Sequence, residues 1–117
     1  MTTELSDQIF LARELRRAGL LFCHVPNGGR RDKGEAARLR ASGVQPGVPD
    51  LLLFDPPPAG DYVGCALELK RAGRRRGKVS DVQQKWLDAL ALRGWAVVVA
   101  YGSDEALTAL QGLGYEV

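Results

Sequence analysis

Apolar residues recur along the chain at helical and at strand spacings, and this alternation predicts four helices interleaved with four strands. The first helix is expected over residues 4–18, with one apolar stripe formed by Leu5, Ile9, Ala12 and Leu15. Further helices are expected near residues 33–41, 80–93 and 103–113, and strands near residues 20–25, 50–54, 62–70 and 95–101.

The order of these elements, α-β-α-β-β-α-β-α, predicts an α/β sandwich with helices around a central mixed sheet. Residues 50–54 and 62–70 are joined by a Pro-rich link that is too short for a crossover helix, so an antiparallel hairpin is expected. The continuous apolar run of residues 95–101 is typical of a strand that is buried on both faces. Ser103 is expected to cap the last helix.

The length of 117 residues predicts a single domain spanning residues 1–117. No apolar run approaches the roughly 18 residues of a membrane span, and the N-terminus does not resemble a signal peptide. We therefore expect a cytoplasmic protein without membrane contact, whose cysteines, Cys23 and Cys65, are reduced core residues. The single histidine, His24, has no partner at the spacing of a zinc site.

Two acids and a lysine stand at the ends of the two hairpin strands. Asp50 opens one apolar run, and Glu68 and Lys70 close the next, after 17 intervening residues. Alternation along a strand directs Glu68 and Lys70 to one face, so pairing of the strands would bring all three side chains together. Two carboxylates form a hard-oxygen site for Mg²⁺, and a lysine beside that ion can orient or deprotonate a water. This set suits phosphodiester hydrolysis, whereas the alternative is ordinary charge at solvated strand ends.

The net charge of +2 conceals a strong segregation of charge along the chain. Residues 68–78 contain six bases and one acid, and residues 30–40 contain five bases and two acids. Clustered bases on a nearly neutral protein indicate a local binding surface for a polyanion. The alternative is a solvated basic loop without a partner.

The ordered set Asp50, Glu68-Leu69-Lys70 and Ser80-x-x-Gln83-x-x-Trp86 resembles the PD-(D/E)xK nuclease superfamily. More narrowly, the chain is similar to the small stand-alone VRR-NUC domains of phages and bacteria. Further matches are His24-Val25-Pro26-Asn27-Gly28, Gly47-Val48-Pro49-Asp50-Leu51, and Gly94 before the strand of residues 97–99.

This resemblance implies a restriction-endonuclease-like three-layer sandwich and a metal-dependent endonuclease acting on DNA. It implies that Asp50 and Glu68 bind Mg²⁺ or Mn²⁺, that Lys70 positions the nucleophilic water, and that Gln83 supports the site. A first-helix acid is expected to face the metal, with Glu4 a better candidate than Glu14. Stand-alone members resemble homodimers that cut branched DNA such as four-way junctions, in a bacterial or phage-infected cell.

Basic and polar residues near these motifs are the candidates for DNA contact, mainly with the phosphate backbone. They are His24, Asn27, Arg30, Arg31, Lys33, Arg71, Arg74, Arg75, Arg76 and Lys78.

Alternative roles remain open for several of these residues. Ser80 and Gln83 also form a capping box, which does not exclude an active-site role for Gln83. His24 can complete a strand end or touch substrate, and Trp86 fits the core better than a base-stacking role. At the level of function, the alternatives are a non-catalytic nucleic-acid-binding module, a partner-binding accessory subunit, and a nuclease of flap or plain duplex DNA.

Overall fold

The computed structural model of the protein describes residues 3–26, 32–73 and 77–117. Within these ranges the elements follow the predicted order. The helices are α1 (Glu4–Arg17), α2 (Lys33–Ala41), α3 (Asp81–Leu92) and α4 (Ser103–Gly112). The strands are β1 (Phe22–His24), β2 (Leu51–Leu53), β3 (Cys65–Lys70) and β4 (Ala96–Tyr101). None of the described helices has the length and apolar character needed to cross a bilayer.

The strands form one mixed sheet in the order β1-β2-β3-β4. β2 pairs antiparallel with both β1 and β3, whereas β3 and β4 are parallel. The link between β2 and β3 is therefore a hairpin connection, as predicted, and α3 supplies the crossover that a parallel pair requires. The predicted mixed α/β sandwich is confirmed.

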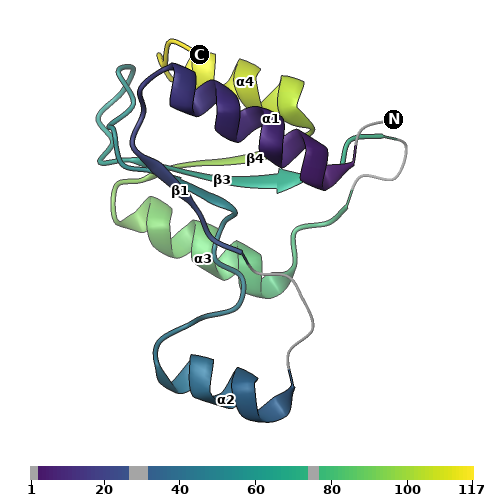
Figure 1. Ribbon diagram of the computed structural model, residues 1–117. Helices are drawn as coiled ribbons and strands as arrows, with labels where there is room; N and C mark the ends of the chain where they lie inside the picture. Colours follow the sequence, from purple (N-terminus) through teal and green to yellow (C-terminus); the bar gives the residue numbers. More distant parts are fainter. Residues whose placement is uncertain (1–2, 27–31, 74–76) are drawn as a thin grey trace.

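The helices form layers on the two sides of the sheet (Figure 1). α1 and α4 lie together on one face, and α3 lies on the other. α2 stands beyond α3, away from the sheet, and contains no buried residue. It begins at an N-cap, Asp32, whose side chain accepts a hydrogen bond from Glu35 N at 2.7 Å. Because an isolated helix of this length is marginal in water, such local capping is important for α2.

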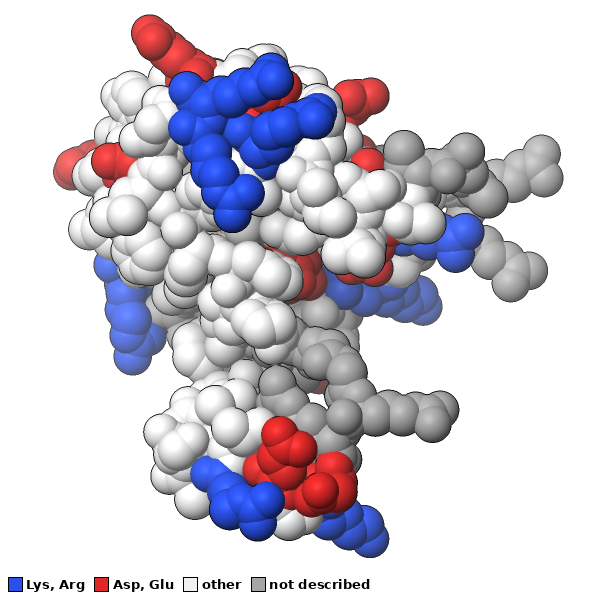
Figure 2. Space-filling view, in the orientation of Figure 1, with Lys and Arg blue, Asp and Glu red and all other residues white. Residues whose placement is uncertain are grey.

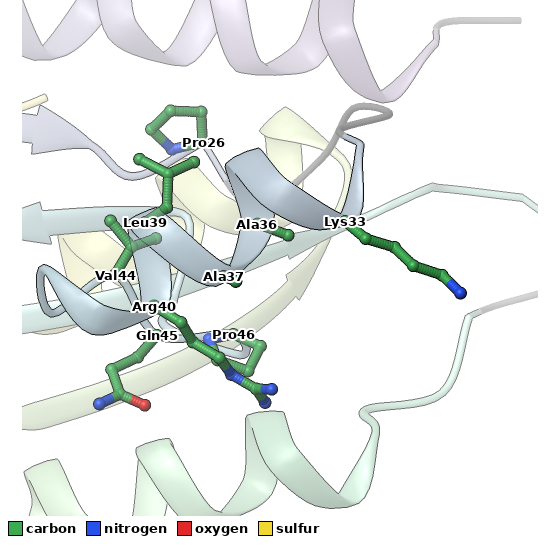
Figure 3. A pocket seen from close by; sticks show the side chains of 9 residues that line it. All are labelled: Pro26, Lys33, Ala36, Ala37, Leu39, Arg40, Val44, Gln45 and Pro46. Atoms are coloured by element: carbon green, nitrogen blue, oxygen red, sulfur yellow. The ribbon is translucent and has the colours of Figure 1, made fainter.

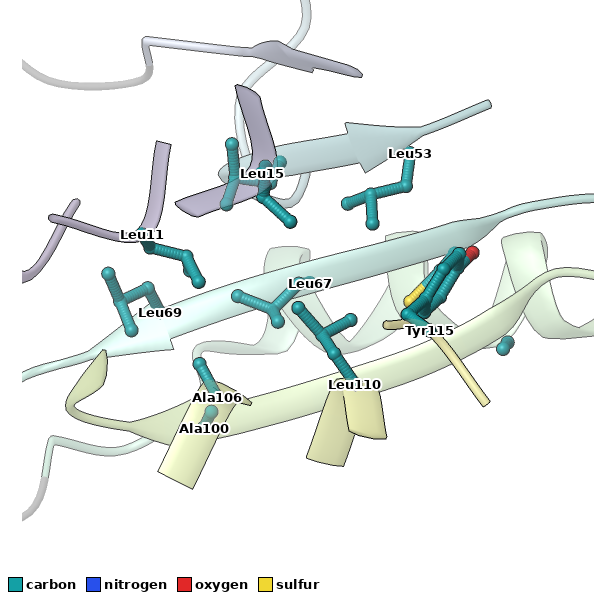
Figure 4. Packing of buried hydrophobic residues seen from close by; sticks show 12 residues of the cluster. Leu11, Leu15, Leu53, Leu67, Leu69, Ala100, Ala106, Leu110 and Tyr115 are labelled. Atoms are coloured by element: carbon teal, nitrogen blue, oxygen red, sulfur yellow. The ribbon is translucent and has the colours of Figure 1, made fainter. Parts of the chain in front are cut away.

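The main core fills the space between the sheet and the layer formed by α1 and α4 (Figure 4). Leu11 and Leu15 from α1, Leu67 and Leu69 from β3, and Leu110 from α4 are fully buried there. Burial of a leucine side chain contributes about 1.5–3 kcal/mol. Since side chains alternate across a strand, the intervening side chains of β3 face α3 instead.

The buried stripe of α1 differs from the predicted one. Leu5 and Ile9 are 68% and 61% exposed, whereas Asp7, Leu11 and Leu15 are buried. Two apolar rows run along this helix, and helical spacing alone does not say which row faces the sheet. The prediction identified the helix correctly and Leu15 as a buried residue, but it was wrong for Leu5 and Ile9 and missed Leu11.

The start of α4 also differs from the prediction, because Ser103 is its first residue and Gly102 is the N-cap. Gly102 has φ of 90°, and a Cβ there would lie 2.9 Å from the Cβ of Ala72, so the turn requires glycine. Ser103 Oγ donates to Asp7 Oδ1 at 3.2 Å. A buried carboxylate of α1 thus lies at the N-terminus of α4, where negative charge is favourable.

The two edge strands are more exposed than expected. In β4, Ala96 and Ala100 are buried, but Val97 is 38% exposed, so the prediction of burial on both faces was wrong. An apolar run alone does not reveal that a strand lies at the edge of its sheet. At the other edge, Cys23 is exposed, and only Cys65 is a core cysteine; both are free thiols.

Candidate active site

Asp50 and Glu68 adjoin each other because of the register between β2 and β3. Leu51 lies opposite Leu67, so the preceding and following residues, Asp50 and Glu68, form the next pair on the other face of the sheet. Lys70 shares this face with Glu68, and its Nζ is 3.9 Å from Glu68 Oε1. The hairpin therefore brings two carboxylates and an ammonium to the side of the sheet that carries α3.

The turn before β2 holds Asp50 against β3. Asp50 Oδ2 accepts a hydrogen bond from Leu69 N at 2.8 Å. Gly47, with φ of 88°, approaches α3 so closely that a Cβ there would lie 2.9 Å from the Val82 backbone. Pro49 is fully buried and restricts the backbone that leads into Asp50. The Gly-Val-Pro segment thus docks the start of β2 onto the first turn of α3.

Gln83 joins the N-terminus of α3 to the charged residues of β3. Its Oε1 accepts hydrogen bonds from Ser80 N at 2.9 Å and from Lys70 Nζ at 2.8 Å. Its Nε2 donates to Glu68 Oε1 at 3.4 Å. Ser80 Oγ in turn accepts from Gln83 N at 3.2 Å, which completes a capping box. One side chain therefore makes both the capping contact and the contacts with Glu68 and Lys70.

Glu68 is a buried carboxylate with an unsatisfied oxygen. Its residue is 3% exposed, and among the described residues no donor reaches Oε2. Burial and, after it, the neighbouring Asp50 carboxyl raise the pKa of Glu68 to about 8, and Lys70 opposes the rise. Two carboxylates in contact are both acceptors when ionised, so they must share either a proton or a cation.

The donor set fits a divalent cation with oxygen ligands. Magnesium needs only one or two carboxylates, since water and substrate phosphate complete its coordination. Asp50 and the buried Glu68 oxygen supply this pair. Within the described ranges no group of three or more His, Cys, Asp or Glu side chains could hold a metal ion. Glu4 is exposed, and its negative charge raises the pKa of Glu68 less than burial and Asp50 do.

The comparison with known families agrees with this geometry. A model of the VRR-NUC domain family matches residues 2–104, which is most of the chain. This chain belongs to the VRR-NUC domain family. The family is generally one of nucleases, and a nuclease domain implies binding of nucleic acid.

The fold of this VRR-NUC domain is also found among solved structures. A VRR-NUC domain protein superimposes with a TM-score of 0.77 at 25% sequence identity. The match covers 99% of this chain and 89% of that chain. No curated protein sequence matches the chain. The structural likeness agrees with the restriction-endonuclease-like sandwich that the resemblance implied.

Four of the residues predicted to contact DNA belong to the described ranges, and they lie in three places. His24 is exposed at the end of β1, with Nδ1 2.8 Å from Asp50 O. Lys33 is exposed at the start of α2, and Arg71 and Lys78 are exposed in the segment between β3 and α3. The other candidates lie outside the described residues: Asn27, Arg30, Arg31, Arg74, Arg75 and Arg76.

Basic side chains lie in several places on the surface of the VRR-NUC domain, including the lower lobe formed by α2 (Figure 2). One group lies beside acidic side chains where β3 ends, and another lies over α1. Two arginines of α1 stack on aromatic rings, with Arg13 5.3 Å from the Phe10 ring and Arg16 5.8 Å from the Phe22 ring. The α1 group therefore has a packing role within the chain.

Tyr101 is a residue near the site that the sequence analysis missed. It pairs with Lys70 in the register of β3 and β4, and its hydroxyl donates to Gly77 O at 2.8 Å. This bond ties Gly77, which precedes Lys78, to the sheet. An aromatic residue at the end of a strand is a weak sequence signal for a residue near a site, because its hydrogen-bond partner is evident only in the structure.

A hollow of about 510 Å³ lies beside α2 (Figure 3). Its walls are mostly apolar, with two basic side chains at the rim. They comprise Pro26, Lys33, Ala36, Ala37, Leu39, Arg40, Val44, Gln45 and Pro46. The hollow contains none of the residues that surround Glu68, so it is separate from the candidate active site.

Proposed function

We propose that this VRR-NUC domain is a divalent-metal-dependent endonuclease that hydrolyses phosphodiester bonds of DNA. The observation that carries the proposal is the buried Glu68 oxygen, which no described donor reaches and which lies beside a second carboxylate. A purely structural carboxylate at such a place would be destabilising. A cation held between Asp50 and Glu68 removes that cost and accounts for the arrangement.

Asp50 and Glu68 are the residues that would hold Mg²⁺ or Mn²⁺. When bound, such an ion neutralises charge on the phosphate and activates a water for attack. Asp50 is fixed for this role by its bond with Leu69 N. Gln83 Nε2 contacts Glu68 Oε1, so the amide leaves the other Glu68 oxygen for the ion.

Lys70 orients the attacking water and offsets negative charge on the phosphate. Its ammonium donates to Gln83 Oε1 at 2.8 Å, and an ammonium has three donors. Two donors thus remain for a water and for a phosphate oxygen. Gln83 keeps the ammonium at this position because its own amide is fixed by the capping box of α3.

DNA would approach along the exposed basic residues on either side of the site. Lys33, Arg71 and Lys78 are exposed and would contact phosphates rather than bases. The choice of branched DNA, such as a four-way junction, rests on the family resemblance. A homodimer in the cytoplasm would present two such sites, which suits paired cuts in a symmetric junction.

The decisive experiment is a cleavage assay on end-labelled four-way junction, flap, single-strand and duplex DNA with Mg²⁺, Mn²⁺ or EDTA. We expect paired metal-dependent nicks in the junction, which are lost in Asp50→Asn and in Lys70→Ala. Lys85→Ala is the matched control, since Lys85 is an exposed lysine of α3. Thermal unfolding checks that every variant is folded.

The assay also distinguishes the alternatives. Junction binding without any cutting would support a non-catalytic binding module. Equal cutting of flap or plain duplex would keep the nuclease but remove the junction preference. Cleavage that survives Asp50→Asn in a folded protein would reject the assigned site.

Metal binding has a test that needs no DNA. At pH 6.5 the carboxyl of Glu68, with a pKa near 8, keeps its proton. Binding of Mn²⁺ at this carboxyl should therefore release a proton to the buffer. Calorimetric titration in two buffers of different ionisation enthalpy should give different heats for wild type and equal heats for Glu68→Gln.

A further inference from the structure

His24 ends β1 at the point where the chain leaves the sheet toward α2, and it contacts the residue that opens β2. Its Nδ1 is 2.8 Å from Asp50 O. We propose that His24 is a positioning residue, which holds the metal-binding residue Asp50 in place with its ring fixed as the Nδ1–H tautomer. The metal-binding part of this inference rests on the proposed function, whereas the tautomer does not.

Asp50 needs such support because it lies just before the regular part of its strand. β2 begins at Leu51 and spans three residues, as does its neighbour β1. Short edge pairings of this kind fray readily. The Asp50 carbonyl accepts two hydrogen bonds, from Val25 N at 2.7 Å and from the His24 ring at 2.8 Å. The imidazole therefore adds a side-chain bond where the ladder ends.

The opposite end of the same residue is held by β3. Asp50 Oδ2 accepts from Leu69 N at 2.8 Å. Backbone and carboxylate of Asp50 are thus fixed from two different strands, β1 and β3. Loss of the His24 bond would leave the Asp50 carbonyl held from the β1 side by Val25 N alone. The weaker restraint would let the second carboxylate oxygen of Asp50 shift relative to Glu68.

The contact also determines the tautomer. A carbonyl oxygen only accepts hydrogen bonds, so Nδ1 must carry the hydrogen. In the neutral ring, Nε2 is then the acceptor. His24 is exposed, so solvent or a substrate group can approach Nε2 of the ring. The bond goes to a backbone carbonyl and not to a reacting atom, which makes His24 a positioning residue and not a catalytic one.

The chain contains a single histidine, so its ring can be observed without ambiguity. Long-range ¹H–¹⁵N correlation spectra of uniformly ¹⁵N-labelled protein, recorded at alkaline pH in EDTA, distinguish the two neutral tautomers. We expect the Nδ1–H form to predominate. A spectrum of the Nε2–H form, or of a mixture typical of a free imidazole, would overturn the proposal.

The metal-binding part is tested by three variants and a Mn²⁺ titration without DNA. The amide nitrogen of asparagine can take the place of Nδ1, whereas that of glutamine corresponds to Nε2. We expect His24→Asn to bind Mn²⁺ within about threefold of wild type. His24→Gln and His24→Ala should bind roughly tenfold or more weakly, as is typical when a group that orients a metal ligand is removed.

Four results would contradict this expectation or locate the error. Wild-type Mn²⁺ affinity in all three variants, or a loss in His24→Asn as large as in His24→Ala, would overturn the positioning role. Asp50→Asn is measured beside them. If Asp50→Asn abolishes Mn²⁺ binding while His24→Ala does not weaken it, only the positioning role fails. If Asp50→Asn also binds normally, the metal site of the proposed function is wrong, whatever tautomer His24 shows.

Discussion

The two faces of β3 show opposite ways of using buried residues. On the face toward α1 and α4, Leu67 and Leu69 are fully buried among other apolar side chains. On the face toward α3, Glu68 is nearly as buried, but one of its oxygens has no donor among the described residues. The first face stabilises the fold because its side chains bury apolar surface area in close packing. The second face costs free energy when both carboxyl groups are ionised, and a shared proton or a bound cation would offset that cost.

This contrast suggests that stability and activity are separable within one strand. Leucines contribute through packing with many neighbours, so their effect is spread over the core. Glu68 and Lys70 contribute through a few directed bonds, in which Gln83 is the common partner. Substitutions on the two faces should therefore affect different measurements.

The largest expected effect on stability comes from the core face. Leu69→Ala should lower the free energy of unfolding by about 3 kcal/mol, because it leaves a cavity between the sheet and α1. Lys70→Ala, one position away, should change it by less than about 1 kcal/mol. Urea denaturation of both variants measures the difference. Equal destabilisation by the two substitutions would mean that the two faces of β3 do not have separate roles in stability and activity.

The second effect concerns Glu68 and has a defined dependence on pH. Its pKa is raised from 4.5 to about 8 in the folded protein, so between these values the folded state keeps a proton that the unfolded chain has lost. Without divalent cations, the free energy of unfolding should then fall with rising pH by up to about 1.4 kcal/mol per unit. Glu68→Gln removes this slope and should be the more stable protein at pH 8.

Denaturation at pH 4.5, 6.5 and 8 in EDTA checks this second prediction. The advantage of Glu68→Gln should be near zero at pH 4.5 and should grow to a few kcal/mol at pH 8. Saturating Mg²⁺ should reduce that advantage, because the ion stabilises the ionised carboxylate of the wild type. Identical pH slopes in the two proteins would show that Glu68 titrates as an ordinary surface acid.

Smaller effects on stability are expected from substitutions in the capping box of α3, where Gln83 also contacts Glu68 and Lys70. Ser80→Ala removes the side chain that caps α3 and should cost about 1 kcal/mol. It leaves Ser80 N bonded to Gln83, so Lys70 keeps its partner. Gln83→Ala should have a similar cost in stability and in addition lower the rate of DNA cleavage roughly tenfold. Urea denaturation and single-turnover cleavage are measured for both, and equal loss of rate would place Ser80 in the site as well.

These contrasts also show what the sequence reveals about the fold. The α/β order and the β2–β3 hairpin were predictable, since they depend on local alternation and on a connection too short for a crossover. The buried row of α1 was not, because Leu5 and Leu11 belong to two apolar rows of one helix. The exposure of Val97 was not, because strand order within a sheet is a long-range property.

The candidate site likewise contains contacts that the sequence predicts and contacts that it does not. The proximity of Asp50, Glu68 and Lys70 follows from strand pairing and alternation, so it is predictable from the order of residues alone. The contact between His24 and the Asp50 carbonyl depends on the pairing of β1 with β2. The bond from Tyr101 to Gly77 depends on the position of β4 beside β3. Such contacts between distant segments have no local signature.

The smallest expected difference is in the reactivity of the two cysteines. Alkylation of their thiols probes the two faces of β3 without substituting a residue on either face. Cys65 lies on the core face of β3, and burial raises the pKa of its thiol to about 12. Cys23 is exposed on β1. Because the thiolate is the reactive form, an alkylating reagent at neutral pH should modify one thiol of the native protein, and this thiol should be absent in Cys23→Ser. The second thiol should react only as fast as the core opens, so its rate measures the stability of the leucine face directly. Rapid modification of both thiols in the native protein would show that this face is not closed, and the contrast between the two sides of β3 would then be lost.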